Sequence, residues 1–207
     1  MSKHTVNLDD IKKMFDSASK AISEKEMELC AIDGVCGDGD HGTAIKGALE
    51  AANIAVASGT DIKNALFDAG MAAMSHSNGS TSTLFGSLFM GLSDGVDNGA
   101  VELDGSALAK AFASGLDSVR GNTQAGVGDK TLMDALIPAV EAMSKSENAS
   151  EALKLASEAA NKGAESTVEL QAKFGRARNL GEKSKGTADA GAVSVSIIFT
   201  EFAKSVL

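Results

Sequence analysis

Apolar side chains recur along most of this chain at intervals of three and four residues, the spacing that places them on one face of an α-helix. The first such run extends from Leu8 to Met27, with Asn7 as its expected N-cap. Seven further runs follow, separated by glycine or short polar residues. The pattern predicts helices over about residues 8–27, 44–57, 61–76, 80–92, 105–119, 131–140, 151–173 and 191–207.

The last of these segments is the one ambiguous case. Residues 192–203, AVSVSIIFTEFA, alternate polar and apolar side chains as a strand would. No other segment predicts β-structure, and a lone strand has no sheet to join, so we expect a helix. Eight helices without a Pro- or Ser-rich linker favour an all-α fold, in which residues 1–207 form one antiparallel, up-and-down domain with short loops.

The glycine-rich loops have a regular place in this arrangement. In an antiparallel bundle, the loops that precede every second helix lie at the same end of the molecule. The second, fourth, sixth and eighth predicted helices follow loops near residues 33–43, 77–82, 121–130 and 176–191. We therefore expect these four loops to form a composite site.

Composition narrows the choice of partners and compartment. The 207 residues carry a formal net charge of -9, so no basic surplus is present to bind nucleic-acid phosphates. The stretch MSKHTVNLDD lacks the apolar core of a signal peptide, and no uncharged apolar run reaches membrane-spanning length. We therefore expect neither export by that route nor a membrane partner. Cys30 and Cys36 lack the CxxC spacing of a zinc site, which favours a reduced, cytoplasmic location.

Candidate chemistry is densest in CGDGDHGTAIKG, residues 36–47. Its glycines satisfy the G-x-G-x-x-G pattern of dinucleotide sites, but the preceding segment predicts a helix and no βαβ unit is present. An EF-hand loop counted from either Asp33 or Asp38 lacks the Glu required at its twelfth position. The Walker A pattern does not occur in the sequence.

A site for a hard cation remains. Asp33, Asp38 and Asp40 supply carboxylate oxygens, which Mg²⁺ prefers, and Mg²⁺ keeps positions open for water or phosphate. Since three carboxylates carry a charge of -3, two Mg²⁺ ions would leave the cluster at +1 and attractive to a polyphosphate. Glycine backbone and the start of the next helix would then offer N–H groups to the phosphates. An acidic glycine turn facing solvent is the alternative.

Other loops carry groups suited to phosphate. Residues 78–83, NGSTST, hold more hydroxyls than a helix cap needs, although a plain capped turn also explains them. Arg176 lies in the most basic stretch, residues 173–185, and a guanidinium binds phosphate oxygens in a fork. Cations near a helix end are the alternative there. Residues 126–131 form another glycine turn, in which Asp129 is a candidate helix cap.

In order along the chain, these motifs resemble the nucleotide-binding L subunit (DhaL-type) of dihydroxyacetone kinases. The resemblance implies an antiparallel eight-helix barrel that binds ADP or ATP and two Mg²⁺ ions in the loops at one end. It covers essentially the whole chain. The stretches that carry it are Asp33, GDGDHG from residue 37, GSTS from residue 79, GDKTLMDA from residue 128 and GRARNLGEKSKG from residue 175.

The resemblance also implies roles for individual residues. Asp33, Asp38 and Asp40 would be the magnesium ligands, and Arg176 would contribute to catalysis. The nucleotide contacts that it implies are His41, Gly42, Thr43, Ala44, Ser80, Thr81, Gly121, Leu132, Arg176, Asp189, Ala190 and Gly191.

The implied activity is phosphoryl transfer through Mg-nucleotide to a short ketose, dihydroxyacetone, held on a separate K subunit. We expect the phosphotransferase-system branch, in which an M-type subunit bearing a phosphohistidine recharges the bound nucleotide. An ATP-dependent kinase for a triose or an erythrulose-type tetrulose is the alternative. A regulatory module that keeps nucleotide as a structural cofactor and binds a transcription regulator is an alternative of another class. A homodimer is left open.

Three positions depart from the pattern of many L subunits. Ala44 stands where they have Asn, which removes an amide near the phosphates. Residues 78–83 stand in place of Gly-Gly-x-Ser-Gly-Pro, and residues 187–192 in place of His-x-Asp-Pro-Gly-Ala. These differences bear on the donor and the sugar, whereas the intact aspartates favour nucleotide binding.

Overall fold

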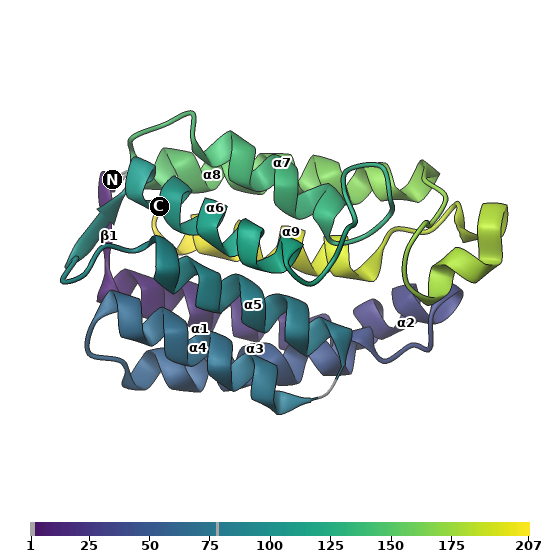
Figure 1. Cartoon of the computed structure of the whole chain (residues 1–207), viewed down its shortest axis with the longest axis horizontal. Helices are drawn as coiled ribbons and strands as arrows, with labels where there is room; N and C mark the ends of the chain where they lie inside the picture. The colour runs from purple at the N-terminus through teal and green to yellow at the C-terminus, as the bar shows by residue number, and fades with distance from the viewer. Residues whose placement is uncertain (1–2, 78) are drawn as a thin grey trace.

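A computed structural model of the chain describes residues 3–77 and 79–207, and α-helices dominate it (Figure 1). Within the described residues there are nine α-helices, two 3₁₀ segments and one pair of short strands. The α-helices are α1 (Leu8–Glu24), α2 (Glu26–Cys36), α3 (His41–Ser58), α4 (Ile62–His76), α5 (Ser80–Gly95), α6 (Gly105–Arg120), α7 (Met133–Met143), α8 (Ala149–Ser166) and α9 (Ala190–Ser205). The other elements are β1 (Thr5–Asn7), β2 (Glu102–Asp104), η1 (Thr167–Glu169) and η2 (Arg176–Ser184).

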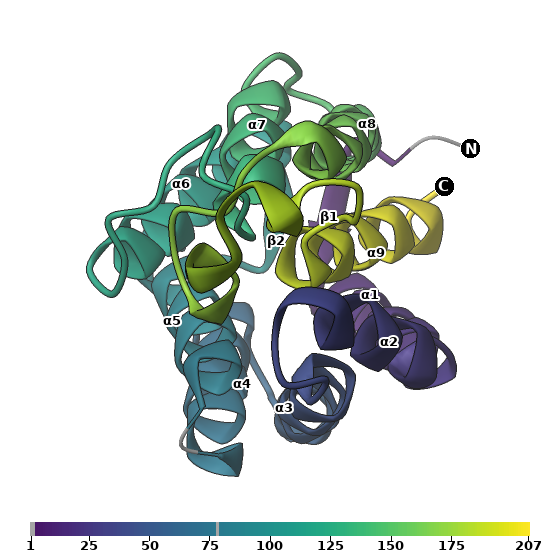
Figure 2. The ribbon, with the colours of Figure 1, turned by 90° about the vertical axis from the view of Figure 1, so that its right-hand side faces the viewer.

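Eight of the α-helices form a closed ring, seen end-on in Figure 2. Around the ring the order is α1, α3, α4, α5, α6, α7, α8, α9, and α9 packs back against α1. Neighbouring helices run antiparallel, as Figure 1 shows. The prediction of an all-α, antiparallel eight-helix barrel is therefore confirmed, with α2 as an additional helix that extends beyond the ring.

The first predicted helix is in fact two. Lys25 ends α1, and α2 begins at the next residue and turns toward α3. Gly42 permits this close approach, since a Cβ there would lie 2.1 Å from the carbonyl oxygen of Glu26. As a result Asp33 lies on a helix, and the predicted loop at 33–43 shrinks to residues 37–40.

The predicted boundaries of the last two segments also move. The segment predicted to be helical through residue 173 leaves the α-helix after Ser166, where the buried Thr167 hydroxyl donates to the carbonyl of Ala164 (2.6 Å). A 3₁₀ turn and an irregular stretch follow. The last segment is a helix, as expected, and begins at Ala190 with Asp189 as its N-cap.

The prediction that no segment other than the last reads as β is wrong. β1 and β2 form an antiparallel pair in which Val6 lies opposite Leu103. Strands of three residues are too short for an alternating pattern to show in the sequence. Both paired side chains are buried, so the pair covers the end of the ring where the chain begins.

Phenylalanines from four helices meet inside the ring. The Phe15 ring on α1 lies 5.1 Å from that of Phe89 on α5 and 5.5 Å from that of Phe202 on α9, between centroids. Phe112 on α6 lies 5.1 Å from Phe199 on α9. The centre is therefore a packed core. No helix of the described residues is long and apolar enough to cross a membrane.

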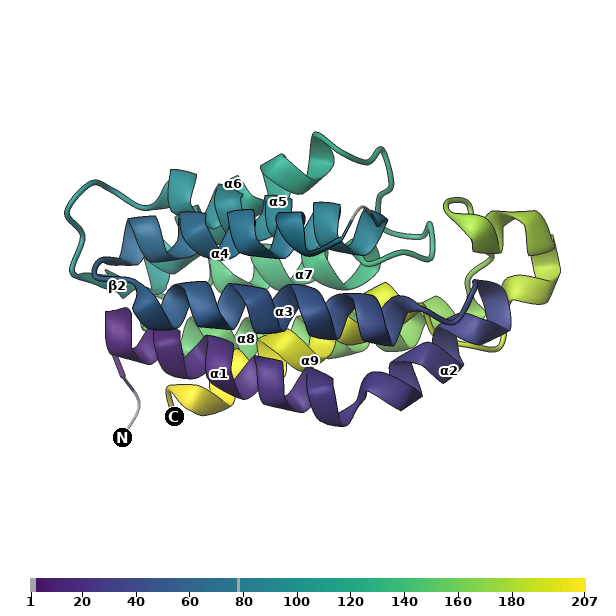
Figure 3. The same ribbon diagram turned by 90° about the horizontal axis from the view of Figure 1, so that it is seen from below.

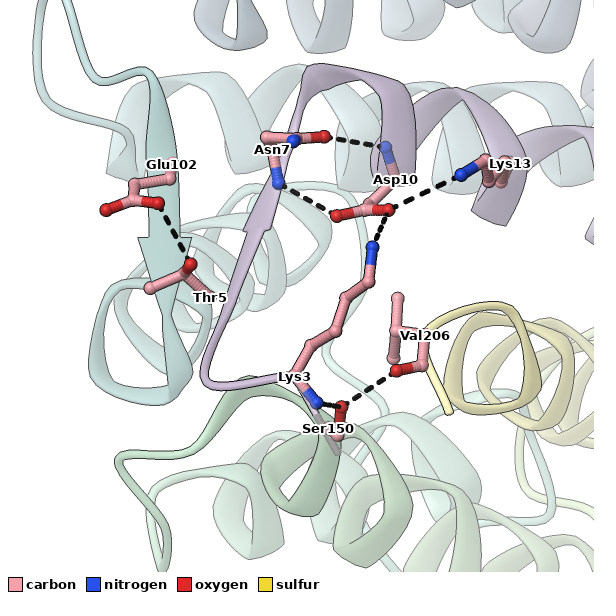
Figure 4. A network of polar contacts seen from close by, with 8 residues as sticks. All are labelled: Lys3, Thr5, Asn7, Asp10, Lys13, Glu102, Ser150 and Val206. Atoms are coloured by element: carbon pink, nitrogen blue, oxygen red, sulfur yellow. Dashed lines mark hydrogen bonds and ion pairs between the residues drawn. The ribbon is translucent and has the colours of Figure 1, made fainter. Parts of the chain in front are cut away.

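A polar network fixes the N-terminal segment to three helices (Figure 4). Asn7 and Asp10 form a capping box at the start of α1, as the Asn7 cap predicted. Asp10 is buried, and its carboxylate also contacts the ammonium groups of Lys3 and Lys13. The Lys3 backbone N–H donates to the Ser150 hydroxyl (2.8 Å) on α8, which donates to the carbonyl after α9 (2.9 Å).

We expect Asp10→Asn to lower the free energy of unfolding by about 1–3 kcal/mol, because a buried group loses its charged partners. Urea denaturation followed by circular dichroism measures this. Asp9→Asn is the matched control, since Asp9 is an exposed acid in the same first turn. It should change stability by no more than about 0.5 kcal/mol. Equal effects of the two substitutions would contradict the role of the network.

Candidate functional site

The predicted gathering of loops at one end is present. A cavity of about 490 Å³ opens there. It is lined by residues at the starts of α3, α5 and α9 and by the loop before α7. Figure 3 shows this end, with α2 and η2, opposite the chain termini. Helix N-termini carry unpaired N–H groups and partial positive charge, so their convergence favours an anion.

The three predicted metal ligands come together at the cavity. Asp33, Asp38 and Asp40 each offer a carboxylate oxygen, and these oxygens lie within 4.8 Å of one another. Asp33 shapes the loop, since its Oδ2 accepts from the backbone N–H of Gly39 (2.9 Å) and of Asp40 (3.2 Å). Gly39 has φ +77°, a left-handed conformation that glycine adopts readily. The spacing of acids and glycines thus brings the ends of the loop together.

The chemistry of this donor set fits a hard cation. All three side chains present oxygen, the ligand atom preferred by Mg²⁺. Arg176, at the start of η2, supplies a positive charge by forming an ion pair with Asp38. One guanidinium against three carboxylates leaves the cluster negative, which also favours a divalent ion.

His41 connects three helices beneath the cavity. Its Nε2 lies 2.8 Å from the Ser194 hydroxyl of α9, and its Nδ1 lies 3.3 Å from the Thr81 hydroxyl of α5. Burial lowers the pKa of His41 to about 4, and the nearby Asp33 carboxylate opposes this shift only in part. The imidazole is therefore neutral at pH 7 and acts as a hydrogen-bonding bridge.

The hydroxyls at the start of α5 are not used as caps. A plain capped turn is the alternative interpretation of residues 78–83, but the N-cap is Gly79, so no hydroxyl of Ser80 or Thr81 caps the helix. Ser80 and Thr81 instead line the cavity. The predicted turn also includes Asn78, which lies outside the described residues.

Asp134, and not the expected Asp129, holds the loop before α7 against that helix. Asp129 does not cap the helix, because its carboxylate accepts from the Gly126 N–H (2.8 Å) and from the Lys173 ammonium (2.8 Å). Asp134, buried inside α7, accepts from the N–H groups of Gly128 (2.6 Å) and Thr131 (2.7 Å). The loop therefore folds back onto the helix that follows it.

Two titratable groups with shifted pKa values also line the cavity, the buried Lys130 and the partly buried Asp189. Burial lowers the pKa of Lys130, and the acidic groups around it oppose this shift. Burial raises the pKa of Asp189 to about 7, even though its carboxylate accepts the Ala192 N–H (2.8 Å) as the N-cap of α9. Lys130 was absent from the predicted site, because nothing in the sequence around it indicates that its side chain is buried.

Most of the predicted nucleotide contacts line this cavity, but three do not. The Thr43 hydroxyl points toward α2 and donates to Glu26 (3.0 Å). Gly42 packs against the backbone of α2, and Gly121 is the C-cap of α6. The sequence also missed an apolar wall, which resembles ordinary helical core in its spacing. The wall consists of Ile32, Leu84, Phe85 and Phe174. The predicted residues on the cavity, besides the three aspartates, are His41, Ala44, Ser80, Thr81, Leu132, Arg176, Asp189, Ala190 and Gly191.

Sequence comparison finds relatives over most of the chain. The PEP-dependent dihydroxyacetone kinase 2, ADP-binding subunit DhaL, of Listeria innocua is 32% identical over 198 residues, which are 90% of this chain and 91% of that protein. Its counterpart in Escherichia coli is 33% identical over 180 residues, 84% of this chain and 85% of that protein. The D-erythrulose kinase of Mycolicibacterium smegmatis is 35% identical over 90% of this chain. The chain spans about a third of that kinase's length (33%).

Structural comparison agrees on the fold. The crystal structure of the dihydroxyacetone kinase from C. freundii in complex with AMP-PNP and Mg²⁺ matches with a TM-score of 0.73 and 24% identity, covering 94% of this chain and 33% of that one. Residues 35–204 match the DAK2 domain family. These matches confirm the resemblance seen in the sequence motifs. The chain belongs to the DAK2 domain family, together with the ADP-binding DhaL subunits of dihydroxyacetone kinases.

Proposed function

We propose that this chain is the nucleotide-binding, phosphoryl-donating part of a ketose kinase, and that ADP or ATP binds with Mg²⁺ in the cavity. The observation that carries the proposal is the cluster of Asp33, Asp38 and Asp40 beside converging helix N-termini. This combination suits a metal-bound polyphosphate, because it offers cation ligands and anion-binding backbone in one place. The ADP-binding names of the DhaL relatives support it.

Asp33, Asp38 and Asp40 would together bind two Mg²⁺ ions. When bound, Mg²⁺ supplies charge that neutralises the phosphate oxygens. The Arg176 side chain is 68% exposed and already reaches this cluster. We therefore infer a catalytic role in which its guanidinium would stabilise negative charge on the transferred phosphoryl group.

The remaining cavity residues suit the two ends of a nucleotide. The start of α3 would offer backbone N–H groups to phosphates at the edge of the cavity, although the Thr43 side chain points away from it. Ser80 and Thr81 add hydroxyls, and α9 adds the backbone of residues 189–191. The apolar wall suits a flat base. At Ala44 the cavity lining has no amide, so backbone and hydroxyl groups make up the phosphate contacts at this point.

The chain's part in the reaction is positioning and electrostatics. Phosphoryl transfer requires an acceptor oxygen in line with the leaving group and stabilisation of charge, and it needs no covalent intermediate on this chain. The acceptor would be a hydroxyl of dihydroxyacetone held on a separate K-type subunit. An M-type phosphohistidine protein would recharge the nucleotide, in keeping with the PEP-dependent names of the DhaL relatives.

A four-carbon ketose is the second candidate acceptor. The observation in its favour is the 35% and 34% identity to a D-erythrulose kinase and an L-erythrulose 1-kinase of M. smegmatis. Mixing the chain with a K-type partner and each ketose in turn distinguishes the two acceptors by the phosphorylated product.

The first experiment identifies the nucleotide and its donor. The freshly purified protein is denatured, any released nucleotide is analysed, and labelled ATP is then offered to the native protein. Tightly held ADP that does not exchange supports recharging by an M-type donor. Rapid exchange supports an ATP-dependent kinase. No nucleotide binding in excess Mg²⁺ contradicts the proposed function.

We expect Asp38→Asn to abolish most of the thermal stabilisation by Mg-ADP, because one of the three metal ligands loses its charge. A ligand at 100 times its Kd stabilises a protein by about 2.7 kcal/mol. Differential scanning fluorimetry with and without Mg-ADP measures the shift in Tm. Asp68→Asn, an exposed acid on α4, is the control and should keep the full shift. An unchanged shift in Asp38→Asn would count against the metal site.

We expect the nucleotide-free protein to lose stability through His41 as the pH falls from 6.5 toward 4. His41 is neutral in the fold with a pKa of about 4, against 6.5 when unperturbed. Its stabilising contribution is present above pH 6.5 and falls by up to about 1.4 kcal/mol per pH unit below it. Urea denaturation between pH 7 and 4.5 should show a shallower loss for His41→Gln, which does not titrate. Identical slopes would show that His41 is not held neutral.

A further inference from the structure

Lys130 is in an unfavourable state in two respects. Its φ of 58° is left-handed, and it is the one residue other than glycine with positive φ among those that the structure describes. Its side chain is also buried, with 3% of the residue exposed. A strained backbone and a desolvated ammonium each cost stability, and such features persist where the surroundings hold them in place.

The Lys130 ammonium joins two segments that are distant in sequence. It donates to the carbonyl of Thr167, after α8, and to the carbonyl of Thr187, in the segment that leads to α9. Two further hydrogen bonds connect the same segments. The Asp189 N–H donates to the Thr167 hydroxyl (2.9 Å), and the Gly186 N–H donates to the carbonyl after Thr167 (2.8 Å).

This junction sets the position of the start of α9. Asp189, Ala190 and Gly191 follow directly and line the cavity. We propose that Lys130 is a positioning residue, which holds the segment 186–189 against Thr167 and so aligns the N-terminus of α9 for the nucleotide. The proposal rests on the proposed function for its ligand. Its physical basis is that N–H groups contribute to affinity only when they are already aligned with the bound group.

Lys63 provides a matched comparison. Its ammonium also donates to two backbone carbonyls, those of Ser93 (3.1 Å) and Val96 (2.6 Å). These lie at the end of α5, away from the cavity, and Lys63 is not among the cavity residues. Replacing Lys63 therefore measures the effect of losing a lysine that bridges two carbonyls. Replacing Lys130 adds the effect of losing the alignment of α9.

The test compares Lys130→Met with Lys63→Met, and Thr167→Val with Thr167→Ser. Hydrogen exchange is measured on the nucleotide-free protein at the amides of Gly186 and Asp189. The Kd for Mg-ADP is measured by calorimetry well below the Tm of each variant. For Lys130→Met and Thr167→Val we expect exchange faster by about tenfold at these amides and a Kd higher by about tenfold, as loss of local alignment predicts.

Thr167→Ser keeps the hydroxyl that accepts from the Asp189 N–H. In this variant and in Lys63→Met, the exchange rates and the Kd for Mg-ADP should stay within about twofold of the wild-type values. The double variant Lys130→Met/Thr167→Val should bind no more than about threefold more weakly than the weaker single variant, because both act on one segment. A purely structural role would instead raise exchange throughout the protein and give additive effects.

The outcomes are separable. If the wild-type chain binds no Mg-ADP, the proposed function fails, and exchange at Gly186 and Asp189 alone decides whether Lys130 holds the segment. If the wild type binds and Lys130→Met binds equally well, the positioning role is overturned. If Lys130→Met does not fold, the contrast between Thr167→Val and Thr167→Ser decides the matter through the other half of the junction.

Discussion

Close contact between helix backbones is the constraint on which the rest of this structure depends. At the crossing of α7 and α8, a Cβ on Gly163 would lie 2.1 Å from the Asp134 carbonyl oxygen. At the crossing of α5 and α6, a Cβ on Gly91 would lie 2.7 Å from the Cα of Gly115. Larger side chains at these points would push the helices apart and widen the ring. Its centre would then no longer be filled by the phenylalanines that meet there.

The closed ring in turn creates the site. Because neighbouring helices are antiparallel, the starts of α3, α5, α7 and α9 face the same end, and no single helix has to supply the whole anion-binding surface. The helix outside the ring, α2, and the loop that follows it place the acidic cluster against this positive end. Of the three cation ligands, α2 supplies Asp33, whereas Asp38 and Asp40 lie in the loop that leads into α3. The approach of Asp33 to the other two aspartates depends on how α2 packs on α3 through Gly42.

The sequence predicts what local periodicity and short-range hydrogen bonds determine. The ring helices follow from their apolar spacing, and the predicted cap Asn7 accepts the backbone N–H of Asp10. Asp61 and Asp104 cap α4 and α6 in the same short-range way. The three aspartates could be found because all lie within eight residues of one another in the sequence. The break at Lys25, the pairing of β1 with β2 and the burial of Lys130 could not, because partners distant in sequence determine them. The prediction that Asp129 caps a helix is wrong for the same reason, because its carboxylate binds the ammonium of Lys173, which is distant in sequence.

The order of the ring has a consequence for how the chain folds. Six of the eight contacts around the ring join α-helices that follow one another in sequence, and a seventh joins α1 to α3 across the short α2. The eighth, between α1 and α9, joins the two ends of the chain. Contacts between consecutive helices form with little loss of loop entropy, whereas the α1–α9 contact encloses almost the whole polypeptide. Phe15 and Phe202 meet across that junction. We therefore expect the contact between α1 and α9 to form late in folding, and the aromatic contact across it to join consecutive helix pairs into one cooperative unit.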